Sequence, residues 1–488
     1  MSPFVALTIL IIYFSVLIAI SIYTSKGADT NTFFTANKQS PWYLVAFAMI
    51  GTSLSGVTFI SVPGAVGNIQ FSYFQVILGN VVGYIFVATV LMPLYYRLNL
   101  VSIYSYLEQR FGFWAYKTGS AFFLIARTLG SAVRLYIAAQ VLQIALYNGL
   151  GIPFEVSVLI TIGLIWIYTF KGGVKTIIIT DTLQTTFLVA AVMLTIYLIS
   201  AELNFSFGDL VSSVANDPKS RIFFFDDLKD DKYFWKKFIS GVFIAITMTG
   251  MDQDLMQKNL TCKNIGEAQK NMFSFTATFV VVNLMFLSLG VLLYQYAQKE
   301  GIALPTRTDE LYPMLALQHF GVNEGTAGLL VAITFLIGIT AATYASSDSA
   351  LTALTTSFCI DFMNVATKTE TERARIKHWV HIGFSLLFYV VILLFNQLNS
   401  KEVVTAVFDI AGYTYGPLLG LFAFGLYTSR QVRDRFVPFV CVLGPLLTYV
   451  LNQNSQEWFG GYKIGFERLI LNGFLIFLGL WAISEKKK

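Results

Sequence analysis

The chain has 488 residues, of which 56% are hydrophobic and only 12% are charged. Soluble domains carry about 25% charged residues, so this composition indicates a helical bundle embedded in lipid. The formal net charge of +5 does not point to nucleic acid as a partner, because the basic residues are spread through loops.

Along the chain, about thirteen apolar segments approach the roughly 20 residues that a helix needs to span a bilayer. The sequence therefore predicts an all-α integral membrane protein with about 13 transmembrane helices. The predicted spans are 4–24, 42–67, 73–98, 117–147, 154–170, 175–201, 238–257, 270–298, 325–362, 378–398, 402–428, 434–452 and 466–484.

The charge distribution predicts the orientation. No Lys or Arg precedes the first apolar stretch, and Lys26 follows it, so it is interpreted as a first helix and not a cleaved signal peptide. With the N-terminus outside, the inside loops hold more than half of the 33 Lys and Arg residues, Lys258 among them. We therefore expect a multi-pass protein of the plasma (inner) membrane with a cytoplasmic C-terminus.

Two of the predicted helices are interrupted. The second contains Gly51, Gly56 and Pro63 within a polar centre, and the seventh is interrupted at Gly250 before an acidic run. Broken helices at membrane depth are tolerated where they line a cavity or are buried in protein. Two interrupted segments at matching places in two halves are typical of a transporter with an inverted repeat.

Helices two to six and seven to eleven then form two five-helix halves, each of which starts with its broken helix. One transporter domain is expected over 1–488. Its parts are an extra N-terminal helix and loop (1–41), the first repeat (42–201), an outer loop (202–237), the second repeat (238–428) and two C-terminal helices (429–488).

A run of small residues and serines over 338–361 lies in the predicted ninth helix. Ala342, Ala345, Ser346 and Ser349 share one face, and Asp348 lies beside it. Serines of this kind also line ordinary helix contacts in membranes, so both interpretations remain open for them. A charge at membrane depth costs at least about 2.5–3.5 kcal/mol, which favours a functional role for Asp348.

Asp181 follows Lys175 by six residues, about 9 Å into the predicted sixth helix. It could pair with a loop lysine, or it could complete a cation site with Asp348 and Ser349. Hard cations such as sodium prefer oxygen ligands, and all three side chains supply them. No basic residue is predicted beside the two acids, so either one of them is protonated or a cation lies between them, and we predict a second sodium there.

Arg127 and Arg134 lie seven residues apart on one face of the predicted fourth helix. Both could pair with carbonyls or carboxylates inside the bundle. Alternatively, the planar donor fork of Arg134 could bind the carboxylate of a solute.

The chain resembles the solute/sodium symporters, a family that includes sodium-driven sugar, proline, iodide and sialic acid carriers. The resemblance covers nearly the whole chain. It rests on four motifs in order, YTFKGGVKTIIITDTLQ (168–184), GMDQDLMQKN (250–259), ATYASSDSALTALTTSFCID (342–361) and GYTYGPLLGLF (412–422).

This resemblance implies a LeuT-like fold, a five-plus-five inverted repeat that works by alternating access. It implies a first sodium site at Gly51, Leu54, Ala342, Ala345 and Ser346. The family often has a hydroxyl residue where this chain has Ala345, so that site is expected to bind sodium more weakly. A second sodium site found in some members maps onto Asp181, Asp348 and Ser349.

The solute is less well determined. The second-helix segment resembles that of sialic acid carriers, which nominates Ser53, Ser55 and Thr58, and Arg134 falls where those carriers place a carboxylate-binding arginine. Those carriers also use a glutamine on the next helix. In this chain the corresponding position is not a glutamine, and Gln75 lies two residues from it. Asp252 and Gln253, beside the break in the seventh helix, complete the candidate solute residues.

The sequence thus predicts a sodium-coupled symporter, with Na⁺ as the coupling ion, that imports a sugar, a sugar acid such as sialic acid, or another carboxylate. It is expected to be a monomer in the lipid membrane and not an enzyme. The alternatives are a membrane sensor that retains a transporter fold, or a carrier of an amino acid or vitamin.

Overall fold

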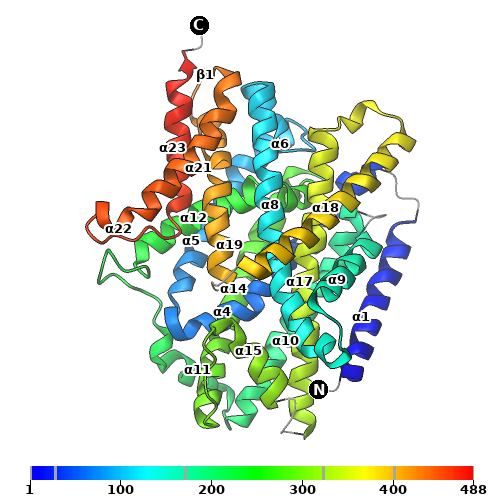
Figure 1. Ribbon diagram of the computed structural model, residues 1–488, viewed down its shortest axis with the longest axis vertical. Coiled ribbons are helices and arrows are strands. Elements are labelled where there is room, and N and C mark those ends of the chain that lie inside the picture. The colour runs from blue at the N-terminus through cyan, green and yellow to red at the C-terminus, as the bar shows by residue number, and fades with distance from the viewer. Residues whose placement is uncertain (1–2, 27–29, 170–172, 321–324, 399–402, 487–488) are drawn as a thin grey trace.

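The computed structural model describes residues 3–26, 30–169, 173–320, 325–398 and 403–486. Within these residues, nearly all regular structure is helical, and two short strands, β1 (Gln431–Val432) and β2 (Ser484–Glu485), pair antiparallel near the C-terminus. Figure 1 shows long helices packed side by side, with the N- and C-termini at opposite ends of the molecule.

Helices occupy most of every predicted apolar segment. In chain order the main ones are α1 (Pro3–Thr24), α3 (Trp42–Ser53), α4 (Gly56–Ile69), α5 (Ser72–Phe86), α8 (Phe113–Leu142), α9 (Phe154–Thr169), α10 (Gly173–Glu202), α12 (Phe234–Ala245), α13 (Gln253–Asn259), α14 (Ile265–Lys299), α17 (Gly325–Asp361), α18 (Glu370–Leu398), α19 (Val403–Thr414), α20 (Gly416–Tyr427), α21 (Val437–Gln453) and α23 (Arg468–Ala482).

Eight of the described helices are long and apolar enough to cross a membrane, and the number rises to ten if each of two bent pairs forms one span. The all-helical membrane architecture is therefore confirmed. The number of thirteen spans and the inverted relation between the two halves stay predictions.

The first break lies where the sequence predicts it. α3 ends at Ser53, Leu54 and Ser55 leave the helix, and α4 starts at Gly56 with its axis turned by 58°. Gly51 and Pro63 both lie inside helical segments, so the interruption is confined to the two residues between α3 and α4.

The second predicted break is also present. α12 continues into a π-helical turn at Ile246–Gly250, and Met251 and Asp252 separate this turn from α13. α13 has only 7 residues, and all of them are buried. The chain therefore carries polar residues into the core directly after the break.

A third break, not expected from the sequence, separates α19 from α20 by 42°. Pro417 lies in the first turn of α20. Its ring cannot donate to the carbonyl four residues earlier and collides with it, so a continuous helix through Tyr413 is disfavoured.

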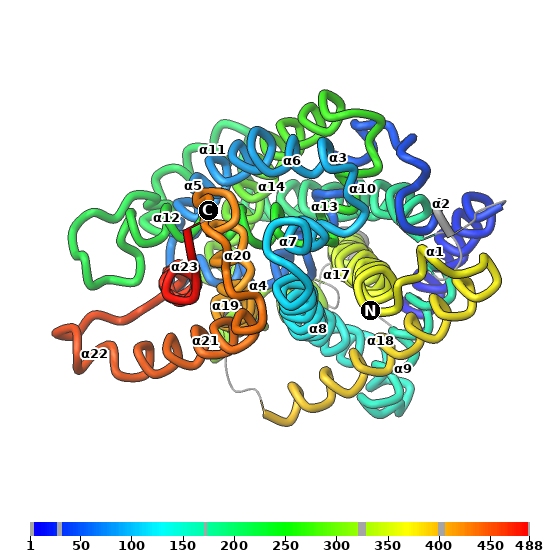
Figure 2. The backbone as a smooth tube through the Cα atoms, turned by 90° about the horizontal axis from the view of Figure 1, so that it is seen from above, coloured from blue at the N-terminus to red at the C-terminus, as the bar shows by residue number. Residues whose placement is uncertain are grey.

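α17 lies in the middle of the bundle. It packs against α3, α4, α8, α10 and α18, while α10 also packs along α3. Figure 2 shows α17 surrounded by α8, α10, α13 and α18, with α1 at one side and α21 to α23 at the other. The run of small residues over 338–361 allows these close approaches.

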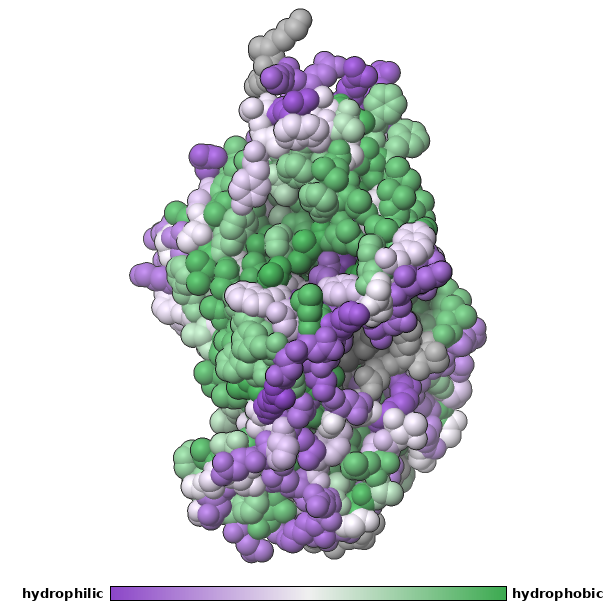
Figure 3. All heavy atoms as spheres, turned by 90° about the vertical axis from the view of Figure 1, so that its left-hand side faces the viewer, coloured by the Kyte–Doolittle hydropathy of each residue, from purple (hydrophilic) through white to green (hydrophobic). Residues whose placement is uncertain are grey.

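The outer surface of α21 is apolar, since Phe439, Val442, Leu443 and Leu446 are all exposed. Figure 3 shows this side of the molecule, where hydrophobic residues cover a broad area and hydrophilic residues gather toward the ends and in a diagonal group below the middle. An exposed apolar area of this extent suits contact with lipid.

Candidate sodium and solute sites

The predicted first sodium site lies where α3 meets α10 and α17. At Gly51 the helices approach so closely that a Cβ atom would come within 2.4 Å of Thr185 Oγ1 and 3.4 Å of Ala345 Cβ. The last carbonyls of a helix lack the amide donors of a following turn. The end of α3, with Gly51 and Leu54, therefore supplies backbone oxygens next to α17.

α17 supplies the remaining residues of this predicted site. Ala342, Ala345 and Ser346 are all buried. Ser346 Oγ donates a hydrogen bond to the carbonyl of Thr343 at 3.0 Å, so its lone pairs remain available to a cation. Ala345 has no side-chain ligand. The donor set of carbonyls and one hydroxyl suits sodium chemically, and its role in binding stays a prediction.

Asp181 does have a basic neighbour, and the expectation that none lies beside it is wrong. The ammonium of Lys258 donates to Asp181 Oδ2 and to Thr52 Oγ1. Lys258 is 1% exposed, and Asp181 is fully buried. The sequence predicts Lys258 in a cytoplasmic loop, but the break before α13 turns the chain back into the bundle and carries this lysine with it.

The other two residues of the predicted second sodium site also have protein partners. Asp348 Oδ2 accepts from the Tyr168 hydroxyl at 2.7 Å, and Asp348 Oδ1 accepts from the Ser349 amide at 2.5 Å. The Ser349 hydroxyl donates to Asp254. Among the described residues, no group of three or more His, Cys, Asp or Glu side chains is arranged to hold a metal ion.

Arg127 is paired inside the protein. It is 3% exposed, and its guanidinium donates a hydrogen bond to Asp254. Its Nη1 atom lies 3.8 Å from Asp252 Oδ2. Asp252 Oδ2 also accepts from the Tyr415 hydroxyl at 2.5 Å, and Asp252 Oδ1 accepts from the Asp254 amide at 2.9 Å at the start of α13. This network pairs Arg127 and Asp252 within the protein, and it leaves the buried Nε of Arg127 without a hydrogen-bond partner.

Arg134 differs from Arg127 in its hydrogen-bond partners. It lines a small cavity of about 100 Å³ together with Arg127 and with Ser53, Ser55 and Thr58, the hydroxyl residues at the α3–α4 break. Within the described part of the chain, no acceptor takes a hydrogen bond from its guanidinium. Ser53 Oγ is buried and likewise has no partner. Four of the predicted solute residues thus share one cavity.

Two further candidates lie outside this cavity. Gln75 is buried, and its Nε2 donates to the carbonyl of Lys232 at 2.8 Å, which ties α5 to the 202–237 segment. Gln253 donates to the Val101 carbonyl at 2.7 Å and accepts from the Ile103 amide at 3.0 Å. Both side-chain amides therefore form hydrogen bonds to backbone groups, and neither lies beside Arg134.

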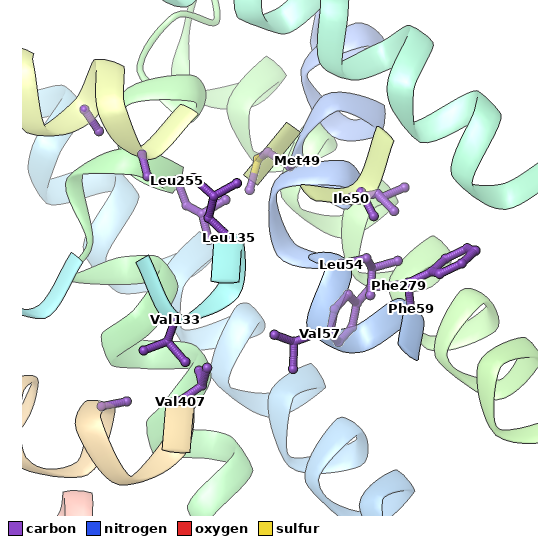
Figure 4. Close-up of a cluster of buried hydrophobic side chains, with 14 of the residues drawn as sticks. Met49, Ile50, Leu54, Val57, Phe59, Val133, Leu135, Leu255, Phe279 and Val407 are labelled. Carbon is purple, nitrogen blue, oxygen red and sulfur yellow. The ribbon is translucent and has the colours of Figure 1, made fainter. Parts of the chain in front are cut away.

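The rest of the cavity lining is largely apolar. Figure 4 shows Val57 on α4, Leu255 on α13, Phe279 on α14 and Val407 on α19, which reach the cavity from four different elements. Sequence reasoning missed these residues, because one apolar side chain in a membrane helix looks like any other.

A second cavity of about 500 Å³ adjoins the first. It lies between the end of α4, the start of α5, α19 and the 452–468 segment, and it shares Val62, Tyr73 and Phe408 with the smaller cavity. Its wall contains an ion pair between Arg468 and Asp409 at 2.9 Å. The two cavities therefore adjoin at Val62, Tyr73 and Phe408, and Arg134 lines the smaller one.

Comparison with known proteins agrees with this architecture. The sodium/sialic acid symporter NanT of Aliivibrio fischeri is 25% identical over 482 residues, which span 95% of this chain and 91% of that protein. Sodium-coupled monocarboxylate transporter 2 of Mus musculus is 25% identical over 87% of this chain, and the match spans 66% of that longer protein.

The fold is shared with a solved structure of a Na⁺-coupled sialic acid symporter in a substrate-bound, outward-open state. The TM-score is 0.81 at 19% identity, and 99% of each chain is covered. The family model described as the sodium:solute symporter family matches residues 33–434. This chain therefore belongs to the sodium:solute symporter family.

Proposed function

We propose that this chain is a sodium-driven symporter that imports a small solute with a carboxylate group. Sodium is the coupling ion, in keeping with the family and with the relatives named above. The observation that carries the choice of solute is the guanidinium of Arg134, which lines a cavity and donates to no acceptor among the described residues.

An arginine stays charged in any protein environment, and a charge in a poorly hydrated cavity needs a partner. Arg127, on the same helix, obtains its partners from Asp252 and Asp254. Arg134 has none of this kind. A solute carboxylate would supply one, because its two oxygens match the donor fork of a guanidinium.

The remaining lining favours a small acid. The cavity measures about 100 Å³, and Val57, Leu255, Phe279 and Val407 supply apolar contacts. A short aliphatic monocarboxylate would place its carboxylate on Arg134 and its carbon chain among these side chains.

A sugar acid such as sialic acid is the second candidate, and the hydroxyls of Ser53, Ser55 and Thr58 support it. Hydroxyl-rich solutes need donors and acceptors of this type, and Ser53 Oγ has no protein partner. A solute of that size requires more room than the small cavity offers. The larger cavity, on the other side of Tyr73 and Phe408, offers the additional volume.

The proposed sodium ligands are the backbone oxygens of Gly51, Leu54 and Ala342, the Ala345 position and the Ser346 hydroxyl. The solute is proposed to enter from the larger cavity, on the outer side of a protein whose N-terminus is outside and whose C-terminus is cytoplasmic. Sodium bound at the end of α3 would fix the α3–α4 break, on which Ser53 and Ser55 lie, and so link the ion to the solute.

Uptake into proteoliposomes tests this proposal. Radiolabelled propionate, lactate, sialic acid and a neutral sugar, glucose, are offered with an inward sodium gradient, with choline in place of sodium as the control. We expect sodium-dependent uptake of at least one acid and no uptake of a neutral sugar. Uptake that is equal in choline would overturn symport, and transport of uncharged solutes alone would overturn the carboxylate.

A further inference from the structure

We propose that the ammonium group of Lys258 stands in for a second sodium ion beside Asp181, so that this chain couples its solute to one sodium. The inference rests on the proposed sodium symport and specifies its stoichiometry. It starts from the contact between Lys258 and Asp181, which links two elements far apart in the sequence.

The contact is enclosed on all sides. Lys258 on α13 is 1% exposed, and its Nζ donates both to Asp181 Oδ2 on α10 and to Thr52 Oγ1 on α3. Thr52 Oγ1 lies 3.1 Å from the same carboxylate oxygen. The ammonium thus meets a carboxylate and a hydroxyl, two oxygen types that a sodium ion would also take as ligands.

Asp348 belongs to the same electrostatic group. It interacts with both Asp181 and Lys258, and its own oxygens accept from the Tyr168 hydroxyl and the Ser349 amide. Two buried acids without a cation would repel each other. Lys258 supplies one positive charge to this pair, which is the charge that a second sodium would have supplied.

A sodium ion beside this ammonium would find one carboxylate oxygen without a hydrogen-bond partner, Asp181 Oδ1, and few other ligands. Asp181 Oδ2 and Thr52 Oγ1 already contact Lys258, and the Ser349 hydroxyl is turned to Asp254, which Arg127 holds. Two positive charges a few ångströms apart also repel strongly where water is excluded. The lysine is tethered to the chain, so it cannot leave with the solute as an ion can.

The transported sodium is then confined to the first site, where α3 ends beside α17. The oxygen ligands proposed for that site differ from the two oxygens that Lys258 contacts. The two groups of oxygens have only helix α3 in common. We therefore infer one sodium ion bound per chain, and one carried per solute.

Direct binding of ²²Na⁺ to the purified full-length protein in nanodiscs tests the inference without transport. We expect about one sodium per wild-type chain. Lys258→Met keeps the length of the side chain but removes its charge, and it should raise the number to two. Lys258→Arg keeps the charge and serves as the matched control, with one sodium expected.

Two sodium ions on the wild-type chain would overturn the inference and leave sodium symport intact, whereas no bound sodium would overturn the proposed function itself. One sodium on a folded Lys258→Met variant would also overturn the inference. If Lys258→Met does not fold, the double variant Lys258→Met/Asp181→Asn removes both charges together. It should bind one sodium, and two would contradict the role of Asp181.

Discussion

Arg127 and Arg134 share one face of α8, but their partners differ. Arg127 is held by Asp252 and Asp254 at the start of α13. Arg134 lies two turns further along, at the cavity below the α3–α4 break, where no described residue accepts from it. One guanidinium therefore contributes to the packing of the bundle, and the other is proposed to bind the solute.

Replacing Arg134 should weaken solute binding. Arg134→Lys keeps the charge but loses the planar fork, and Arg134→Gln loses both, so the second change should have the larger effect. We expect losses of about 1–3 kcal/mol, the scale of a charge-assisted hydrogen bond, which is roughly 5- to 150-fold in affinity.

Isothermal titration with the transported acid measures this loss, and ²²Na⁺ binding to the same variants is the control. Sodium affinity should change little, because Arg134 is not among the proposed sodium ligands. Normal solute affinity in Arg134→Gln would assign Arg134 a structural role and remove the basis for a carboxylate.

Replacing Arg127 should instead lower the stability of the fold. Arg127→Met leaves Asp254 buried without its partner, and removing one member of a buried ion pair costs about 3–5 kcal/mol. We expect a clear fall in the melting temperature of the purified protein. The double variant Arg127→Met/Asp254→Asn should recover part of it, and a double variant no more stable than Arg127→Met would count against the pair.

Ser346 is the one side-chain hydroxyl among the proposed first-site ligands. Ser346→Ala removes that oxygen, so the sodium concentration for half-maximal uptake should rise several-fold, while the solute affinity at saturating sodium stays near the wild-type value. Thr340→Ala, which removes a buried hydroxyl on α17 that donates to the Leu336 carbonyl of the same helix, is the control. An unchanged sodium dependence in Ser346→Ala would exclude Ser346 as a ligand.

At the scale of helices, the α3–α4 break depends on how closely α4 approaches α17. A Cβ atom at Gly56 would lie 2.3 Å from Thr343 Oγ1 and 3.1 Å from Ile339 Cδ1. Gly56→Ala should therefore push the start of α4 away from α17 and reduce sodium affinity. Gly130→Ala on α8, where a Cβ would meet no atom within 4 Å, is the matched control.

Sodium-induced thermal stabilisation of the two glycine variants measures this effect. We expect the sodium-dependent shift to shrink in Gly56→Ala and to remain in Gly130→Ala. Equal shifts in both variants would show that the contact between α4 and α17 does not influence the sodium site.

The breaks also explain how far the sequence could predict this structure. The α3–α4 and α12–α13 breaks follow from glycines within polar stretches, and the cluster of Ser53, Ser55, Thr58 and Arg134 follows from helix spacing and family resemblance. The position of Lys258 did not follow, because a short polar run after a break can leave the membrane or turn back into the bundle. Only the tertiary packing of α13 distinguishes these two courses.

Across the whole molecule, the last turn of α17 is tied to α8 by side-chain hydrogen bonds. Asp361, the last residue of α17, accepts from the Tyr116 hydroxyl at 2.8 Å and from the Ser357 hydroxyl at 2.5 Å. Lys117 also donates to the carbonyl of Asp361, which ties α8 to α17 there.

Alternating access requires the larger cavity to change during transport, and Phe408 lines both this cavity and the smaller one. A cysteine at this position should react with a membrane-impermeant thiol reagent from outside the cell when sodium is present. Bound solute should slow the reaction by closing this path. All three native cysteines, Cys262, Cys359 and Cys441, are buried, so background labelling should be low.

The labelling rate of Phe408→Cys in intact cells tests both the gate and the orientation. Ser212→Cys on the exposed face of α11 (Phe207–Asn216), outside the larger cavity, is the control and should react equally with and without solute. Because the 202–237 segment is predicted to be outside, both cysteines should be reachable from the medium. Failure to label Ser212→Cys would reverse the predicted orientation, and a Phe408→Cys rate unaffected by solute would exclude Phe408 from the gate.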